Sequence, residues 1–495
     1  MRFLPSHPIL DPKAAGVLEK ALFEGDEMRE WVAMQRAGRG LSDGIRTDLG
    51  ATGASLSAGR VLVLAGKGHN AGDALIAAAG LLETYPECTV DVAFVFGLNA
   101  LRPLAARAWR DLVILSPHRV RSVTTANLAA RYTVVIDGLF GFGYRPPLPP
   151  GTRQWLSLVN AVPARLRAAV DLPSGLGEEG AFRADVTYAT GSIKSPIVDL
   201  PGAGRIHWLD LGFFSGDEPG DDRALSSSVL EPLRALRPAH SDKRSYGHVF
   251  VLGGSRSYPG AVLMAVQAAV RAGAGLVTAF VPESLAPAFA AVCPEAMWQA
   301  CPETSDGGLA VDSSHLVRIR LDRANAVLVG PGLGREPESL AVVTSLVREA
   351  NVPVVLDADA LQPQIVWSGS CPRILTPHAG EFQRVSNGVD LREFRPTQHG
   401  ITVLKGPVTR ISDGCGVIYH SFAGGPVLAR GGSGDMLGGI IAALLAANPA
   451  APLEAAARGV FWHGRAAEKL AEARGEVAVR ATELLDYLGP ALREE

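Results

Sequence analysis

Short apolar segments alternate with amphipathic segments along the first half of the chain. The apolar segments have the length of buried strands and cover residues 60–65, 90–96, 133–137 and 168–171. Helical spacing of apolar residues marks residues 12–40, 74–83 and 102–112. Strands that alternate with helices in this way predict a parallel sheet with helices on both faces.

The same alternation starts again near His240. Predicted strands cover residues 247–252, 276–281, 326–329, 352–356, 373–375 and 401–404. Between the halves, residues 213–222 are rich in Gly, Pro, Asp and Glu and have no apolar period, which predicts an exposed connection. We therefore expect two doubly wound, three-layer α/β domains, at residues 1–215 and 229–495, joined by a linker at residues 216–228.

Polar or glycine-rich clusters follow three predicted strands of the first half. They are the loop 66–73 (GKGHNAGD), Asp137 with the glycines after it, and the segment 171–175 (DLPSG). The first has the strand, glycine loop, helix order of a phosphate cradle, although a tight turn without a ligand has the same pattern. Because ligands of parallel sheets bind beyond the carboxyl ends of strands, three such clusters favour one shared pocket.

The segment 427–445 (VLARGGSGDMLGGIIAALL) is the strongest candidate for chemistry in the second half. Its glycines let backbone N–H groups approach an anion, and the helix start adds partial positive charge. Asp435 lies at this helix start, where a carboxylate can accept a proton from a substrate hydroxyl during phosphoryl transfer. An aspartate that only caps the helix fits the same pattern.

The composition limits the partners. The formal net charge of -3 argues against nucleic acid or an anionic membrane as the main partner. The five cysteines are scattered without C-x-x-C spacing, so neither a zinc site nor a disulfide framework is indicated. The most apolar window, residues 261–282, contains Gln267 and Arg271 and predicts a buried helix followed by a buried strand. We expect a soluble cytoplasmic protein without nucleic-acid or membrane partners.

The first-half motifs GKGHNAGDA, IDGLFGFG, DLPSGL and ADVTYATGSIK resemble the epimerase domain of the bifunctional NAD(P)H-hydrate repair enzymes. The resemblance implies a Rossmann-like domain that interconverts the R and S hydrates of NADH and NADPH. It implies a potassium ion on Asn70, Asp137 and Ser174, which offer the oxygen ligands that a hard cation prefers. Asp171, with Lys194 nearby, is the candidate for the proton transfers that open and reclose the hydrated ring. The implied substrate contacts are Asp171, His69, Asn70, Ala71, Gly72, Asp73, Gly141, Phe142, Gly143, Tyr144, Arg145, Pro146 and Pro147.

The first loop departs from the family pattern of two asparagines followed by two glycines. Here the four positions are His69, Asn70, Ala71 and Gly72, and Ala74 replaces a common glycine. We expect the added Cβ atoms to tighten the loop and to affect the epimerase rate more than the fold.

The second-half motifs GHVFVLGGSRSYPGA, GPGLG, LDADAL, TPHAGEF, LKGPVT and GGSGDMLGG resemble the ADP-dependent NAD(P)H-hydrate dehydratase domain, a member of the ribokinase-like superfamily. The resemblance implies that Asp435 takes the proton from the C6 hydroxyl of the hydrate while the β-phosphoryl group of ADP, with Mg²⁺, moves to it. Loss of phosphate then leaves NAD(P)H and AMP. The implied hydrate contacts are Ala261, Gly332, His378 and Asp435, and the implied nucleotide contacts are Lys405, Gly406, Pro407, Val408, Thr409 and Gly434.

Simpler roles exist for several of these residues. His378 could cap the helix after it, and Lys405 could be a solvated turn lysine. We interpret Asp357 and Asp359 as strand-end or capping acids rather than catalytic groups.

Two other functions fit parts of the pattern. The second domain could be an ATP-dependent kinase for a vitamin or sugar alcohol, and the first could be a nonenzymatic binding or dimerisation module. We expect the bifunctional repair enzyme, because a stereospecific dehydratase alone would strand the R epimer. Its expected partners are NAD(P)H hydrates and ADP, and we expect a homo-oligomer.

Overall fold

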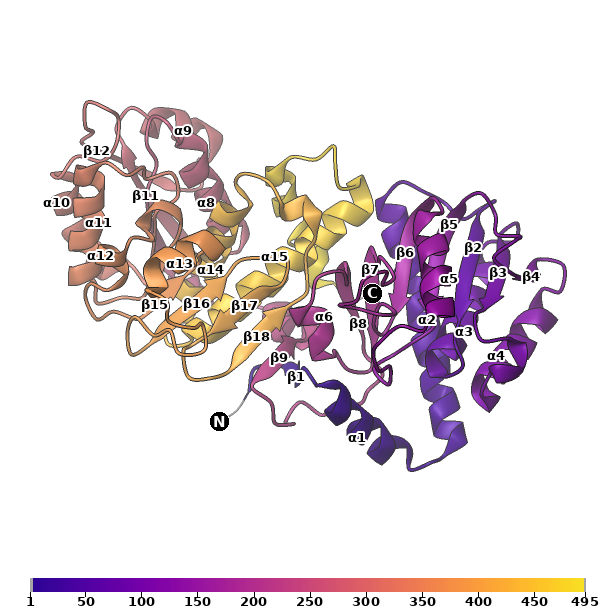
Figure 1. Ribbon diagram of the computed structural model, residues 1–495. Helices are drawn as coiled ribbons and strands as arrows, with labels where there is room; N and C mark the ends of the chain where they lie inside the picture. Colours follow the sequence, from indigo (N-terminus) through magenta and orange to yellow (C-terminus); the bar gives the residue numbers. More distant parts are fainter. Residues whose placement is uncertain (1–2, 494–495) are drawn as a thin grey trace. The chain divides into compact units, whose positions relative to one another are not determined.

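The computed structural model describes residues 3–493, which form two compact units (Figure 1). The N-terminal unit comprises residues 7–220 and 472–475, and the C-terminal unit comprises residues 3–6, 221–471 and 476–493. The division falls inside the segment expected to be a linker. Within that segment, β9 (Asp222–Leu225) is a strand of the C-terminal unit.

The N-terminal unit is built on a parallel seven-stranded sheet in the order β4-β3-β2-β5-β6-β7-β8. Its strands are β2 (Arg60–Ala65), β3 (Thr89–Phe94), β4 (Val120–Val123), β5 (Tyr132–Gly138), β6 (Ala164–Val170), β7 (Val186–Thr190) and β8 (Arg205–Leu209). The strand order runs in opposite directions from β2 and β5. The carboxyl ends of these two strands therefore form the topological switch point, where ligands of such sheets bind.

Alternate residues of β2 face two different layers, as the pleat of a strand requires. Val61 and Val63 pack in one core with helices α2, α3 and α4, whereas Leu62 and Leu64 pack in a second core with α5. The helices of this unit are α1 (Pro12–Phe23), α2 (Glu27–Ala51), α3 (His69–Thr84), α4 (Pro103–Leu115), α5 (Pro150–Ala161) and α6 (Ser195–Asp199). The prediction of a three-layer α/β domain is confirmed.

The helical segment predicted at residues 12–40 is in fact two helices, and the second is longer than predicted. Glu24 ends α1 in a left-handed conformation, and the Asp26 side chain caps the start of α2. The predicted end near residue 40 was wrong, because the glycines there serve packing instead. A Cβ on Gly38 would lie 2.5 Å from Ile76 of α3, and one on Gly44 would lie 2.4 Å from the Tyr188 ring.

The C-terminal unit contains an eleven-stranded sheet in the order β1-β9-β18-β17-β16-β15-β14-β13-β10-β11-β12. Its strands other than β9 are β1 (Ser6–Pro8), β10 (His248–Leu252), β11 (Leu276–Pro282), β12 (Met297–Cys301), β13 (Ala326–Val329), β14 (Val354–Leu356), β15 (Arg373–Leu375), β16 (Gly400–Leu404), β17 (Thr409–Ser412) and β18 (Ile418–Ser421). Only the pairings of β17 with β16 and β18 are antiparallel among the strand pairs described from β9 to β12. The switch point lies between β10 and β13.

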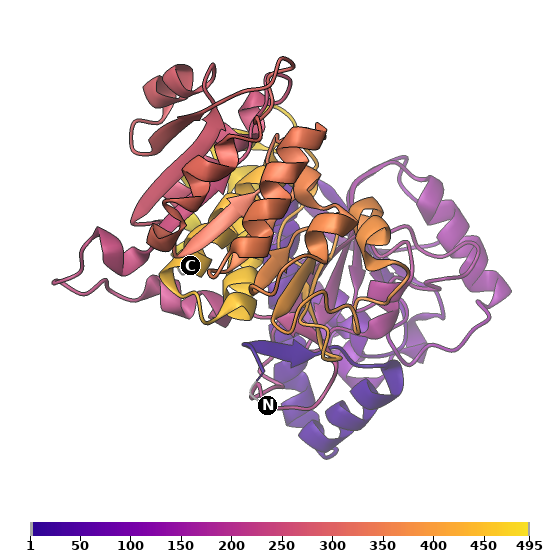
Figure 2. The same ribbon diagram turned by 90° about the vertical axis from the view of Figure 1, so that its left-hand side faces the viewer.

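Helices cover both faces of this sheet (Figure 2). One core joins the sheet to α8 (Pro259–Arg271), α14 (Ser433–Ala447) and α15 (Pro452–Arg474). The other core joins it to α10 (Ser313–Arg318), α11 (Pro337–Glu349), α12 (Pro363–Val366) and α13 (Ala379–Ser386). The window 261–282 is a buried helix and strand, as predicted, and none of the described helices is both long and apolar enough for a membrane span.

Residues 3–6 belong to the C-terminal unit although they begin the described chain. The buried Arg223 of β9 donates hydrogen bonds to the Ser6 hydroxyl at 2.8 Å and to the Ser6 carbonyl at 3.0 Å, and its guanidinium lies 3.8 Å from the centre of the Phe3 ring. Leu4 donates its N–H to the Tyr419 hydroxyl at 3.3 Å. A segment at one end of the chain therefore completes a sheet edge made about 220 residues later.

Candidate active sites

The N-terminal unit has a cavity of about 340 Å³ at the switch point of its sheet. The start of α3, the loop after β5, Asp171 after β6 and Thr190 at the end of β7 line it. Helices α1 and α2 add Glu19, Phe23 and Glu30. Residues of all three predicted polar clusters therefore line this one cavity.

Asp171 and Lys194 form a buried ion pair in this region. The Lys194 Nζ lies 2.5 Å from Asp171 Oδ1 and donates a second hydrogen bond to the Thr190 carbonyl at 2.8 Å. The backbone N–H of Phe142 donates to Asp171 Oδ2 at 3.3 Å. Asp171 has a φ of 66°, a left-handed conformation that is uncommon outside glycine and is often retained at functional sites. The pair places a proton acceptor and a proton donor side by side.

Two further carboxyl groups near this pair have raised pKa values. Burial raises the pKa of Asp73 well above its usual range, and the Asp171 carboxylate adds to the effect. Burial raises the pKa of Glu19 to about 7, opposed by Lys194 and supported by Asp171 and Glu30. Carboxyl groups that hold protons near neutral pH are typical of sites that transfer protons.

Asn70, Asp137 and Ser174 lie together, as the expected potassium triad requires. Ser174 donates from its hydroxyl to Asp137 Oδ1 at 2.8 Å and from its N–H to Oδ2 at 2.7 Å. Burial raises the pKa of Asp137 to about 6, although the bonds from Ser174 oppose this. The Asn70 amide nitrogen donates to the carbonyls of Phe140 and Val170 at 3.1 and 2.8 Å, so these two oxygens converge. Asn70, Asp137 and Ser174 thus offer side-chain oxygens, and one of them is a buried carboxylate, which is the ligand type that a hard cation prefers.

Several other predicted contact residues have structural partners. Ala71 is buried, and a Cβ on Gly72 would stand 2.3 Å from the Met34 sulfur, so this side of the loop faces α2. His69 lies 3.4 Å from the Glu30 carboxylate. The Tyr144 hydroxyl donates to Glu178.

The end of the second loop turns toward the surface. Arg145 donates to the carbonyls of Phe142 and Tyr144 and is exposed, as are Pro146 and Pro147. Gly141, Phe142 and Gly143 line the cavity, whereas Tyr144, Arg145, Pro146 and Pro147 do not belong to its described lining.

The C-terminal unit places Asp435 in the first turn of α14. Gly432, with a φ of 93°, occupies the N-cap position, so Asp435 is not the capping residue. Burial raises the pKa of Asp435 to about 6, the Asp357 carboxylate adds to this rise, and Lys405 opposes it. A carboxylate with this pKa is ionised at neutral pH and is a stronger base than an ordinary aspartate.

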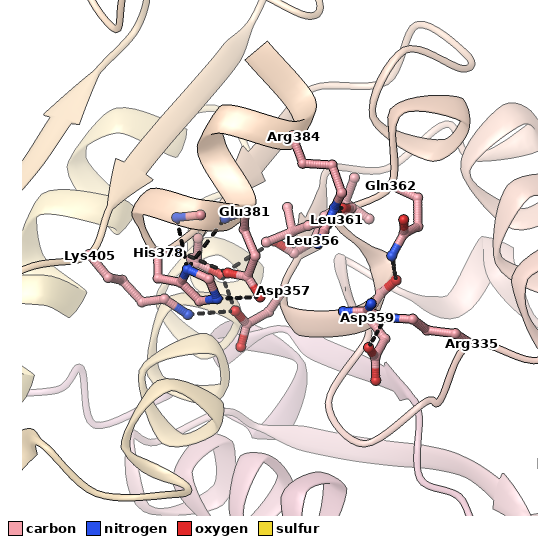
Figure 3. A network of polar contacts seen from close by, with 12 residues as sticks. Arg335, Leu356, Asp357, Asp359, Leu361, Gln362, His378, Glu381, Arg384 and Lys405 are labelled. Atoms are coloured by element: carbon pink, nitrogen blue, oxygen red, sulfur yellow. Dashed lines mark hydrogen bonds and ion pairs between the residues drawn. The ribbon is translucent and has the colours of Figure 1, made fainter. Parts of the chain in front are cut away.

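Lys405 follows β16 and forms an ion pair with Asp357, which follows β14 (Figure 3). Its Nζ lies 2.9 Å from Asp357 Oδ1, and the Thr376 hydroxyl donates to the same oxygen at 2.7 Å. The Nζ also lies 3.2 Å from the position that a Cβ of Gly434 would take. Burial opposes its charge, but Asp357 and other carboxylates raise the pKa of Lys405. A positive charge therefore lies at the glycine turn that begins α14.

His378 caps α13, as the simpler interpretation predicts (Figure 3). Its Nδ1 accepts the N–H groups of Gly380 and Glu381 at 3.1 and 3.3 Å, and Glu381 accepts the His378 N–H at 2.9 Å. His378 also forms a parallel β-bridge with Lys405, so the two residues are neighbours. The ring is 63% exposed and remains accessible while it caps the helix.

The remaining predicted residues of this unit lie at a helix start or in the loops that follow strands. Ala261 is in the first turn of α8 and adjoins Gly332, because a Cβ on Gly332 would stand 3.1 Å from the Ala261 Cβ. Gly406, Pro407 and Val408 form the turn between β16 and β17, and Thr409 is the first residue of β17.

Sequence reasoning missed several residues that these sites contain, among them Glu19, Phe23 and Glu30 of the N-terminal cavity. Asp357 had been interpreted as a strand-end acid, yet it pairs with Lys405 and affects the pKa of Asp435. Its place directly after a predicted strand was the available signal. Phe213, inside the predicted exposed connection, lines the N-terminal cavity. No pattern in the local sequence indicated this contact.

Comparisons with known proteins cover both units. The profile described as NAD(P)H-hydrate dehydratase matches residues 249–490, and the profile described as YjeF-related protein N-terminus matches residues 31–195. A bifunctional NAD(P)H-hydrate repair enzyme of Gloeobacter violaceus is 35% identical over 507 residues, covering 96% of each chain. One from Moorella thermoacetica is 32% identical, covering 88% of this chain and 87% of its own. A ribokinase-like superfamily protein of Enterococcus faecalis is 28% identical, with a TM-score of 0.49, and covers 56% of this chain and 98% of its own.

Proposed function

Because this chain belongs to the family of bifunctional NAD(P)H-hydrate repair enzymes, we propose that its two units repair hydrated NADH and NADPH in sequence. The N-terminal unit interconverts the R and S hydrates. The C-terminal unit converts the S hydrate to NAD(P)H and consumes ADP, giving AMP and phosphate. The observation that carries this proposal is the similarity to bifunctional relatives over nearly the whole chain, since an ordinary kinase would lack the first unit.

In the C-terminal unit, Asp435 is the proposed base. Its carboxylate takes the proton of the C6 hydroxyl as the β-phosphoryl group of ADP, bound as its Mg²⁺ complex, moves to that oxygen and AMP leaves. Phosphate then leaves C6 while C5 loses a proton, which restores the double bond of NAD(P)H. The pKa of about 6 supports this role, because the group is ionised at pH 7 and still basic.

Lys405 and the start of α14 are proposed to bind the phosphates of the nucleotide. The ammonium group lies beside Gly434, in the first turn of α14, and both the ammonium charge and the helix start attract anions. Gly406, Pro407, Val408 and Thr409 would continue the nucleotide contact along the turn after β16. Ion pairing with Asp357 keeps Lys405 charged and directed at this turn before the nucleotide arrives.

The hydrate is proposed to bind between Ala261, Gly332, His378 and Asp435. Ala261 and Gly332 adjoin each other, and Gly332 has a φ of 64° that disfavours any side chain. His378 is held by its capping bonds, so its exposed ring has a fixed position from which to contact the ligand.

In the N-terminal unit, Asp171 and Lys194 are proposed to transfer the protons that open and reclose the hydrated ring. His69 to Asp73 and the loop Gly141 to Pro147 would hold the nucleotide. The ion pair at 2.5 Å supports this assignment, because it couples a carboxylate to a proton donor at the edge of the cavity.

Potassium is proposed to bind Asn70, Asp137 and Ser174. When bound, it would compensate the buried Asp137 charge and fix the ends of β5 and β6 relative to α3. The buried Asp137 carboxylate, which is hydrogen-bonded to Ser174, supports the site, because a hard cation prefers oxygen ligands.

The test is recovery of absorbance at about 340 nm from a mixture of R and S NADH hydrates with Mg²⁺ and either ADP or ATP. The wild type should restore all absorbance with ADP. Asp435→Asn should restore almost none, and Asp171→Asn should stop early near the S fraction. Accumulation of a phosphorylated product without absorbance would instead indicate a small-molecule kinase.

A further inference from the structure

Helix α1 lies over the N-terminal cavity although the matched family profile begins only at residue 31. Its approach to the site is fixed at both ends. Leu10, just before the helix, forms a parallel β-bridge with Lys194, accepting the Ser195 N–H at 2.8 Å. At the other end, the Phe23 ring packs edge-on against Phe213 with 5.7 Å between ring centres.

One face of α1 therefore points at the site. A Cβ on Gly16 would lie 3.5 Å from the Phe142 ring, so the helix backbone contacts the loop that donates a hydrogen bond to Asp171. Residues three apart lie on the same face of a helix, which places Glu19 beside Gly16 and toward the cavity. Glu19 lines the cavity together with Asp171 and is partly buried.

We propose that Glu19 is a second catalytic acid–base of the epimerase, acting on the hydrated ring from the α1 side while Asp171 and Lys194 act from the strand side. This inference rests on the epimerase function proposed above. The C6 hydroxyl lies on opposite faces of the ring in the R and S hydrates, so epimerisation must remove a proton on one face and return one on the other. A single proton-transfer pair on one side of the ring reaches only one of these faces.

The proposed reaction needs no oxidant or co-reactant. One group takes the proton of the C6 hydroxyl, the C6–N1 bond breaks to leave a C6 aldehyde, and N1 gains a proton. Rotation about C5–C6 turns the aldehyde over. N1 then attacks C6, loses its proton, and the new hydroxyl is protonated on the opposite face by the second carboxyl group.

The surroundings of Glu19 suit a group that both accepts and donates a proton. Burial raises its pKa to about 7, Asp171 and Glu30 support the rise, and Lys194 opposes it. Asp73, His69 and Arg102 are the other charged or titratable residues of this cavity, and His69 lies beside Glu30. Near pH 7 both forms of such a carboxyl group are present in comparable amounts.

The decisive experiment measures the exchange of pure R hydrate into S hydrate by chromatography, with the uncatalysed rate subtracted. Glu19→Gln should lower the exchange rate about 100-fold or more, as expected for loss of a general acid–base. Glu24→Gln is the matched control, since Glu24 ends the same helix and its side chain is 73% exposed. It should stay within about twofold of the wild type. The ADP-dependent dehydration of S hydrate by the same preparations should not change.

The outcomes separate this inference from the proposed function. Loss of exchange in Asp171→Asn together with a normal rate in Glu19→Gln would overturn the role of Glu19 and leave the epimerase intact. No catalysed exchange in the wild type would overturn both. If Glu19→Gln melts at a lower temperature, Glu19→Leu decides instead, because an apolar side chain of similar size leaves no polar group to be buried without a partner. Exchange in that variant would overturn the proposal, and its loss would support it.

Discussion

The dehydratase should lose activity below pH 6, because its proposed base must be ionised. The pKa of Asp435 is about 6 rather than the ordinary 3.8. About nine-tenths of the group is then carboxylate at pH 7 and about one-tenth at pH 5. The fraction of enzyme with an ionised base decreases as the pH falls through the pKa. We therefore expect kcat/KM to fall about tenfold between pH 7 and pH 5. An aspartate with the ordinary pKa would keep about nine-tenths of its activity at pH 5.

Asp357→Asn should move this acid limb to lower pH. Asp357 raises the pKa of Asp435, although burial is the larger cause of its rise from 3.8 to about 6. We therefore expect a shift of about half to one pH unit downward. Lys405→Met removes a positive charge that lowers the pKa of Asp435, so the acid limb of this variant's pH profile should move to higher pH. Asp359→Asn is the matched control. Asp359 is paired with Arg335 and has the weakest of the described effects on the pKa of Asp435, so we expect the acid limb to move by no more than about 0.2 pH unit.

The assay is kcat/KM for pure S hydrate, because this parameter reports the pKa values of the free enzyme. AMP should be measured by chromatography of quenched samples, since NADH itself decomposes in acid. Only the position of the limb is compared, because Lys405→Met also weakens nucleotide binding. A wild-type profile that stays flat to pH 5, or shifts of the same sign in both variants, would refute the electrostatic account of Asp435.

Three further outcomes follow from the geometry. Gly141→Ala places a Cβ 2.6 Å from Asn70 Oδ1, so R-to-S exchange should fall at least about tenfold with dehydration unchanged; equal exchange would contradict the close approach. Gly332→Ala places a Cβ 2.3 Å from the Tyr258 carbonyl at a φ of 64°, so KM for the hydrate should rise about tenfold and Tm should fall by a few degrees in a melting scan. Replacing potassium by tetramethylammonium should reduce exchange but not dehydration, and Asp137→Asn should make exchange insensitive to potassium.

The sheets were predictable because their strands are buried on both faces and appear as short, continuous apolar segments. The segments at 60–65, 326–329 and 373–375 match β2, β13 and β15 residue for residue. Much of the candidate sites was predictable for the same reason. In a parallel sheet, the carboxyl ends of the strands lie at one edge, so Asp137 and Asp171 could be grouped before any geometry was known. Asp435 was predictable from a different signal, the glycine turn at the start of a helix.

Contacts between segments that are far apart in the sequence were not predictable in this way. Glu19 reaches the cavity because Leu10 pairs with Lys194, and nothing in either local sequence encodes that pairing. Helix α2 continues through Gly38 because α3 approaches it closely, which overrides the low helix propensity of glycine. Tyr144 was grouped with the pocket by resemblance, but in the structure its hydroxyl donates to Glu178. The expected homo-oligomer stays a prediction.

The placement of residues 3–6 in the C-terminal unit has a consequence for how the protein is made. Ser6 leaves the ribosome 217 residues before Arg223, the buried side chain that it contacts. At about 5–20 residues per second, this gap corresponds to roughly ten to forty seconds of synthesis. Residues 3–6 must therefore wait, without their partner Arg223, while the whole N-terminal unit is made and can fold. A tag or leader that delays or blocks this late pairing would impair the dehydratase, although it is attached next to the epimerase in the sequence.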